Sequence, residues 1–420
     1  MKKHLIFNIY HLLFIALFLL IVQYSMINAF AQIAVKGETV WTMAGEPITN
    51  GVVLVNSNGK IEAVGTANQI KIPNNYRVIS AKVVTPGLID AHSVVGLAGY
   101  LNQPHDQMQL ETSSPMQPEL RAIDAYNPEE KLIEWIRSFG VTTIHTGHSV
   151  GALISGQTMV AKTFGKTTDA ATIAPTAMIA VTLGQSGLAG QGRSPGTRAK
   201  QAAMLRAALI GASEAVNKSN ANKDGDKKTD AKPSSDLRGE MMQRVVRREI
   251  PLLVTAHQAQ DIMTALRIAK EFNIRIVLDG AAEAYLIIDE IKAANIPVII
   301  HPTMFRAGGE TENLNMETAS KLRAAGITVA LQSAFEGYVP KTRVVLFEAA
   351  LAAANGLSRR DALATITIDA AKIIGLDARI GSLVKGKDAD LAMYDGDPFE
   401  YTTHCTGTMI NGQMVSETIR

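Results

Sequence analysis

The stretch VVTPGLIDAHSVVG, residues 83–96, decides how the rest of the chain is interpreted. An apolar run leads into the turn at Pro86 and Gly87, and a second apolar run then carries Asp90 and His92. This pattern indicates a buried strand that ends in two side chains able to hold a proton or a metal. The residue two positions after His92 is Val94, so a single imidazole stands at this strand end.

Helix and strand patterns alternate downstream of this stretch. The apolar residues of EEKLIEWIRSFG (129–140) have helical spacing, Gly140 ends the helix, and the strand VTTIH follows. Three further units follow at nearly constant spacing, and each of their strands is a continuous apolar run: AQDIMTALRIAKEFN with IRIVLDG, AEAYLIIDEIKAAN with IPVIIHP, and METASKLRAAG with ITVALQS. Such units predict an α/β fold, and enough of them predict a (β/α)₈ barrel. A doubly wound open sheet is the alternative, but no Gly-x-Gly-x-x-Gly follows an early strand.

Both ends of the remaining chain are rich in short strands. GVVLVNSNGKIEAVG (51–65) reads as a hairpin, and two runs near the other end, 388–399 and 407–415, have the same character. We therefore expect a small β-sandwich built from residues 32–84 and 380–420, with the barrel occupying residues 85–379.

The first 31 residues have the layout of a secretory signal peptide. The positive start MKK precedes the short apolar core LLFIALFLLIV (12–22), and Ala29-Phe30-Ala31 fits a cleavage site. An uncleaved membrane anchor is the alternative, although the apolar core is shorter than a span of about 20 residues. We expect an exported protein located in a bacterial periplasm.

Composition excludes several classes of protein. The net charge is only +2 with mixed signs, so nothing indicates a nucleic acid or, after signal cleavage, a membrane as partner. The single cysteine, Cys405, permits neither an intrachain disulfide nor a zinc–thiolate cluster. Any metal must therefore be held by histidine, carboxylate or a modified lysine.

One segment within the predicted barrel is unlike its surroundings. Residues 217–236 are polar, charged and nearly free of apolar side chains, so we expect a mobile surface insertion. A basic docking patch is the functional alternative, although the aspartates of the segment dilute its positive charge.

Histidines gather at the predicted strand ends. Five of the nine stand at or just past the end of an apolar strand, namely His92, His145, His148, His257 and His301, and Asp279 ends another strand. In a barrel these ends converge on one face, where active sites are built. A single histidine at such a place is more often bonded to a backbone carbonyl than to a metal. The set as a whole favours a polar pocket that can bind a metal.

The motifs PGLIDAH (86–92) and GSLVKGKDADLAMYD (381–395), together with the β-rich termini, resemble the amidohydrolase superfamily, particularly its imidazolonepropionase-like and prolidase-like branch. The resemblance covers essentially all of the chain after residue 31. It implies a metal-dependent barrel with an appended β-sandwich that hydrolyses amide, lactam or amidine C–N bonds, and in some members C–O or P–O bonds. In such enzymes one or two metals lower the pKa of a bound water.

Carried onto this chain, the resemblance also marks departures from the family pattern. His92 matches the first histidine of the family's His-x-His pair, while Val94 takes the second place. His257 stands where the fifth strand supplies a ligand, and Asp279 stands about where the sixth strand supplies another histidine. The eighth strand reads Gln332-Ser333-Ala334 where an aspartate is expected, with Glu336 the nearest acid. TAMIAVTLG has no clear counterpart of the bridging residue on the fourth strand.

The resemblance therefore implies an altered metal site. His92, His257 and Asp279 would hold one divalent metal, most readily zinc, and Glu336 or His301 would move the proton; His145 and His148 are alternative ligands. Other polar residues at predicted strand ends suggest that the pocket still binds something: Gln157, Gln185, Gln258, Thr303 and Arg306.

Two functions follow from these residues. The first is a hydrolase that acts on a non-peptide or small-peptide C–N bond of a small-molecule substrate through metal-activated water. The second is a catalytically inactive protein of the same fold that binds a small ligand or a partner protein at the same face. A purely structural envelope protein is a third reading with little support. The sequence sets neither substrate nor oligomeric state.

Overall fold

The computed structural model describes residues 32–101, 103–190, 192–224, 236–301, 307–334 and 344–419, without the side chains of 222–224. The predicted signal peptide lies outside these residues. Within the described part, the strands form a seven-stranded, a six-stranded and a four-stranded sheet. No helix of this part is long and apolar enough to cross a membrane.

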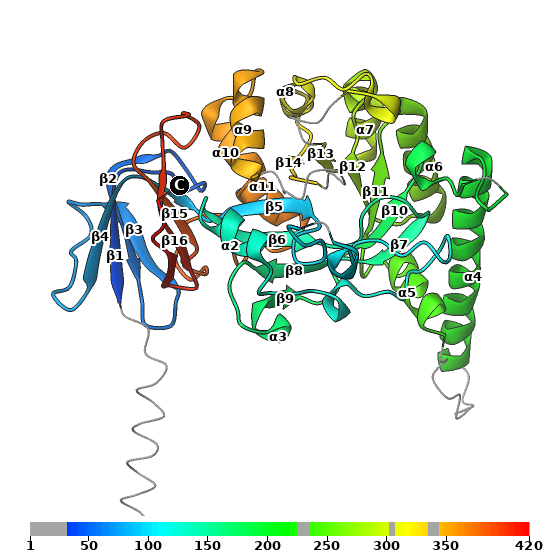
Figure 1. The fold of residues 1–420 in the computed structure, drawn as a ribbon, viewed down its shortest axis with the longest axis horizontal. Coiled ribbons are helices and arrows are strands. Elements are labelled where there is room, and N and C mark those ends of the chain that lie inside the picture. The colour runs from blue at the N-terminus through cyan, green and yellow to red at the C-terminus, as the bar shows by residue number, and fades with distance from the viewer. Residues whose placement is uncertain are drawn as a thin grey trace, which may run out of the picture.

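Strands from both ends of the chain build the seven-stranded sheet, as the sequence predicts. Its order is β17-β16-β15-β4-β1-β2-β3, and Figure 1 shows the blue N-terminal and red C-terminal strands side by side. The hairpin β2–β3 turns at Gly59, whose φ of +70° and close approach to Asn411 leave no room for a side chain. The strands are β1 (Ile33–Val40), β2 (Ile48–Val55), β3 (Ile61–Thr66), β4 (Arg77–Pro86), β15 (Leu391–Tyr394), β16 (Cys405–Ile410) and β17 (Gln413–Ser416).

The two remaining sheets form the body of the molecule. The six-stranded sheet has the order β14-β13-β12-β11-β10-β7, and the four-stranded sheet has the order β5-β6-β8-β9. Their strands are β5 (Leu88–Ser93), β6 (Val141–Thr146), β7 (Ile154–Gln157), β8 (Met159–Lys162), β9 (Thr172–Ala174), β10 (Ile179–Thr182), β11 (Leu252–Ala256), β12 (Ile276–Gly280), β13 (Val298–Ile300) and β14 (Val329–Leu331).

The hydrogen bonds of the described residues do not close these sheets into the predicted (β/α)₈ barrel. Strands β10 to β14 pair in parallel, as do β5 and β6, but β7 and β8 run antiparallel to β10 and β6. Only Thr158 separates β7 from β8, so one stretch of chain supplies the edge strand β7 of the six-stranded sheet and the inner strand β8 of the four-stranded sheet. At the other side a single parallel bridge, Ser93 with Ala334, brings β5 beside the end of β14.

The helices largely follow the predicted periodicity. The helices expected before β6, β12, β13 and β14 are present, although the one before β13 covers only Ile288–Ala294. Asn273 and Asn295 end two of them in the left-handed conformation, which asparagine tolerates. The helices are α2 (Lys131–Arg137), α3 (Thr168–Ala171), α4 (Arg198–Asp224), α5 (Leu237–Val246), α6 (Ala259–Phe272), α7 (Ile288–Ala294), α8 (Thr318–Ala324), α9 (Val345–Ala354), α10 (Arg359–Thr365) and α11 (Ile368–Ile373).

The start of the predicted insertion is corrected by α4. This helix continues through residues 217–224, which we expected to lie outside regular structure. A polar composition does not prevent a helix from being extended, because each added residue costs well under 1 kcal/mol once the helix has been nucleated. Residues 225–235 lie outside the described part.

Candidate functional site

The C-terminal ends of β5, β11, β12, β13 and β14 meet around a cavity of about 80 Å³. Parallel strands carry the residues at these ends to the same edge of the sheet. The apolar side chains of Val94 and Val150 line part of the cavity, and its polar lining includes His92, Thr255, His257, Asp279, His301 and Gln332. The structure thus brings together four of the residues that the sequence singled out.

A buried histidine–carboxylate pair forms one wall. His92 Nδ1 lies 3.0 Å from Asp279 Oδ1, and both side chains are less than 10% exposed. Asp279 also accepts a hydrogen bond from Thr255 Oγ1 at 2.6 Å and one from Gln332 Nε2 at 2.9 Å. Burial alone would raise the pKa of Asp279, but His92 and the other donors lower it overall. The ionised carboxylate can only accept, so His92 Nδ1 carries the hydrogen.

The same pair determines the protonation of His92. Burial alone would lower the pKa of this imidazole, but the charge and hydrogen bond of Asp279, helped by Asp90, raise it above its ordinary value. Its Nε2 is buried and has no hydrogen-bond partner among the described residues. This nitrogen is therefore the one available to a bound molecule.

The pKa of His301 is shifted in the opposite direction. Its Nδ1 lies 3.2 Å from the Gly280 carbonyl oxygen, which can only accept, and its Nε2 is buried without a partner in the described part. Burial, and secondarily His257, lower the pKa of His301 to about 4. His301 is therefore neutral at neutral pH, and its Nε2 is an acceptor. His257 is also neutral, because burial lowers its pKa more than the nearby carboxylates raise it.

His145 and His148, the alternative ligands, do not line the cavity. His145 Nδ1 contacts the Ala91 carbonyl oxygen at 2.7 Å, and its Nε2 contacts Thr158 Oγ1 at 2.6 Å, so neither nitrogen is free. The ring of His148 packs against Gly156, where a Cβ would lie 2.5 Å from it. The structure corrects the expectation for His145, whose two nitrogens are both engaged by protein. Both nitrogens of His148 lack a partner among the described residues, so its role as a ligand stays a prediction.

None of the predicted rim glutamines lines the cavity, and two of them bond to other protein groups. Gln157 bonds the Pro118 carbonyl and Thr176, and Gln258 accepts a hydrogen bond from Arg198. Gln185 is absent from the cavity lining. The inference that these residues mark a retained ligand pocket is therefore corrected. Glu336, Thr303 and Arg306 lie outside the described residues, so the proposed role of Glu336 stays a prediction.

Two contributing residues were missed from the sequence. Thr255 lies two positions before His257, and side chains two positions apart on a strand point to the same face. This spacing is the feature of the sequence that could have identified Thr255. Gln332 was recorded only as a departure from the family pattern, yet it holds the carboxylate that orients His92. The contact between Gln332 and Asp279 could not be predicted from a local sequence pattern. It depends on how β12, β13 and β14 are aligned with one another in the sheet.

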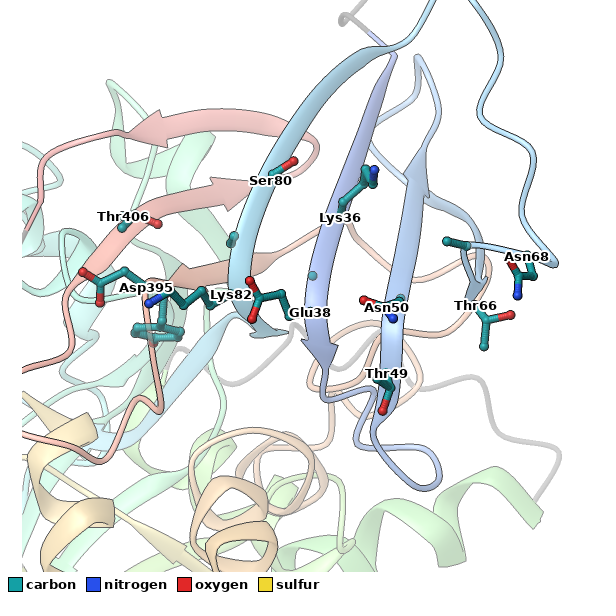
Figure 2. Close-up of a pocket in the computed structure, with 15 residues that line it drawn as sticks. Lys36, Glu38, Thr49, Asn50, Thr66, Asn68, Ser80, Lys82, Asp395 and Thr406 are labelled. Carbon is teal, nitrogen blue, oxygen red and sulfur yellow. The ribbon is translucent and has the colours of Figure 1, made fainter.

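A second hollow lies on the seven-stranded sheet. It has a volume of about 880 Å³, and Figure 2 shows its lining side chains, among them Lys36, Glu38, Lys82 and Asp395, on neighbouring strands of this sheet. Its lining contains no histidine and none of the predicted site residues. The smaller histidine-lined cavity is therefore the candidate functional site.

The described residues do not fit a metal as they stand. Imidazole nitrogens without partners suit zinc by their chemistry, and a carboxylate behind His92 is a common way to orient such a ligand. However, no three histidine, cysteine, aspartate or glutamate side chains of the described part lie together as a metal would require. Both Asp279 oxygens also accept hydrogen bonds. We therefore derive no reaction step through a metal.

Comparison with known proteins defines the class. The amidohydrolase family model matches residues 132–416, and an amidohydrolase from Thermotoga maritima MSB8 is 31% identical, with a TM-score of 0.85 over 92% of this chain and 100% of that one. The chain belongs to the amidohydrolase family, whose members are generally metal-dependent hydrolases. No curated protein matches the sequence.

More distant solved structures share the fold. A prolidase complexed with N-methylphosphonate-L-proline is 15% identical, with a TM-score of 0.59 over 92% of this chain and 100% of that one. An adenosine deaminase from Xanthomonas campestris with bound zinc is 15% identical, with a TM-score of 0.52 over 91% of this chain and 92% of that one.

Proposed function

We propose that this protein is a hydrolase that cleaves a C–N bond of a small, non-peptide or short-peptide substrate in the histidine-lined cavity. The proposal is supported by the family and by its hydrolase relatives. One observation carries it: His92 and His301 line the same cavity, and each has a buried Nε2 without a partner among the described residues. Their pKa values are shifted in opposite directions. Titratable groups whose environments separate their pKa values are typical of acid–base catalysis.

The two histidines match the two proton transfers of such a hydrolysis. Water adds its oxygen to the carbon, the C–N bond breaks, and the nitrogen leaves with a proton. His301 Nε2, an acceptor, takes one proton of the attacking water. His92, protonated on both ring nitrogens, gives its Nε2 proton to the leaving nitrogen, and proton exchange with solvent then returns both histidines to their starting forms. Asp279 accepts the Nδ1 hydrogen of His92 and favours the protonated ring that donates from Nε2. The cavity has room for the reacting group of a substrate and a water, since water occupies about 30 Å³ in the liquid.

A screen for released amine tests this function. Dipeptides, N-acyl amino acids, lactams and cyclic amidines would be incubated with the purified protein, with and without added zinc or manganese. We expect time-dependent hydrolysis of at least one class, with kcat reduced by a factor of about 10² or more in His301→Gln. Release that is equally fast in the variant would overturn the role of the cavity.

Zinc as cofactor is a separate proposal. The set His92, His257 and Asp279 stays a prediction, and ligand binding there would require Asp279 to give up one of its hydrogen bonds. Elemental analysis of protein purified without chelator tests it. About one zinc per chain, lost in His257→Ala, would support the site. A chain without metal, before and after zinc loading, would contradict it.

A catalytically inactive ligand-binding protein is the second candidate. The full engagement of Asp279 and the Val94 side chain in the cavity favour it over a two-metal hydrolase. If the protein is inactive, we expect no compound of the screen to be hydrolysed. We expect some of the compounds to bind the folded protein and raise its melting temperature.

The proposal also includes the type of fold and the location of the protein. We propose that the parallel strands of the six- and four-stranded sheets correspond to the family's barrel, in which the bridge between Ser93 and Ala334 joins β5 to the end of β14. We also propose export to a periplasm, based on the first 31 residues. Mass spectrometry of protein from a bacterial periplasm would show a chain that begins at Gln32; a chain that retains residues 1–31 would contradict cleavage.

A further inference from the structure

A groove of about 1320 Å³ lies at the opposite end of the strands from the histidine cavity. The residues just before β11, β12, β13 and β14 line it, whereas the cavity is formed by the residues at the other ends of the same strands. A five-residue strand such as β12 separates the two by roughly 15 Å. A molecule bound in the groove would leave the cavity open.

The rim of this groove is strongly basic. Six exposed cationic side chains line it and only one carboxylate, Glu290, does so. We call it the basic groove, defined by Arg248, Arg267, Lys270, Arg275, Lys292 and Lys372. The whole chain carries a formal charge of only +2, so positive charge is concentrated here.

Most of these cations lack an acidic partner. Among the described residues, Lys372 pairs with Asp369, but no ion pair joins the other five to a carboxylate. Several other arginines do have an acidic partner, as Arg206 has Glu271 and Arg379 has Asp388. Lys270 and Lys292 stand in the last turns of α6 and α7, where they offset the negative helix ends. Arg248 donates hydrogen bonds to Asn273, and Arg275 donates one to the Glu249 carbonyl oxygen, but neither bond neutralises the positive charge. No hydrogen bond or ion pair of the described residues engages the side chain of Arg267.

The floor of the groove is apolar. Leu266, Ile274, Ile296 and Ile327 line it between the charged side chains. A flat bilayer surface would contact only the charged side chains at the rim of the groove. An extended peptide chain can enter the groove and contact its apolar floor as well. Carboxylates match the forked guanidinium groups of the rim, and apolar side chains match the floor.

We propose that the basic groove is a docking site for an acidic peptide segment of a partner protein, one that carries apolar side chains between its carboxylates. The proposal does not depend on the hydrolase function, because the groove and the cavity lie at opposite ends of the strands. Its affinity is dominated by charge and therefore falls as salt screens the pairs.

Fluorescence anisotropy tests the proposal with a fluorescein-labelled peptide of alternating glutamate and leucine and the folded protein at low salt. We expect saturable binding, weakened at least about tenfold by Arg267→Glu with Lys270→Glu. The matched control, Lys200→Glu with Lys218→Glu, reverses the same number of charges on exposed positions of α4 and should change the affinity less than about twofold.

Four results would overturn the proposal. One is the absence of binding by the unmodified protein, and another is equal weakening in the α4 control, which would show unspecific charge attraction. Equal affinity for an all-glutamate peptide would show that the apolar floor is not used. Tighter binding to phosphatidylglycerol vesicles through the same residues would assign the groove to a membrane.

Discussion

At the scale of single residues, Asp279 has the largest expected influence on the proposed site. It accepts hydrogen bonds from His92, Thr255 and Gln332, and its charge keeps the pKa of His92 raised against the effect of burial. In Asp279→Asn the charge is gone and the volume is unchanged, so we expect the pKa of His92 to fall. NMR titration of ¹³C-labelled histidine measures it, with Asp395→Asn, beside the exposed His404, as control. An unchanged His92 pKa would contradict the pairing.

His145 supplies a prediction about pH and stability. Burial lowers the pKa of His145 to about 4, below the value of about 6.5 in an unfolded chain. The unfolded state then binds the extra proton, so this contribution to stability is complete above pH 6.5 and is lost as the pH falls towards 4. His145→Gln removes it. Urea unfolding at pH 7.5 and 5 should show a free-energy loss about 2 kcal/mol smaller in the variant than in the unmodified protein. Equal losses in both proteins would contradict the buried, neutral state.

At the scale of elements, one buried lysine joins the two parts of the molecule. Lys162, from β8, is 3% exposed and contacts Asp388 at 3.1 Å and Asp390, both of which precede β15. Lys162→Met would leave the aspartates buried with fewer partners, which typically costs about 3–5 kcal/mol. Urea unfolding measures the change, and Lys36→Met on the exposed face of β1 serves as control. A loss no larger than that of the control would show that the buried pair contributes little.

The elements also show what could be predicted from the sequence. Helices α2, α6 and α8 and strands β12 to β14 follow from apolar periodicity, because each packs one face or both faces against its neighbours. The antiparallel direction of β7 and β8 was not predictable, because short apolar runs carry no sign of their partner's direction. The hydrogen-bond partners of His145 and Gln157 could not be predicted either. The sequence locates the ends of their strands, but it does not show which way the side chains at those ends point.

At the scale of the whole molecule, the sheet built from both chain ends makes the C-terminus essential for folding. β15 pairs with β4 and β16, so a chain that ends at residue 384 would expose the edge of β4 and remove both partners of Lys162. We expect this truncation to abolish soluble, folded protein as judged by circular dichroism. Removal of residues 417–420 alone should leave the melting temperature unchanged within a few degrees. A folded product of the longer truncation would contradict this account.

The central claim is that the cavity of His92, His257 and His301 hydrolyses a C–N bond. It is tested most directly by kcat/KM for the best substrate of the amine-release screen, compared between the unmodified protein, His301→Gln and His404→Gln. His404 lies in the seven-stranded sheet, half exposed and remote from the cavity. We expect a loss of about 10²-fold or more in His301→Gln and none in His404→Gln. Equal rates in all three proteins, or no hydrolysis of any substrate by the unmodified protein, would contradict it.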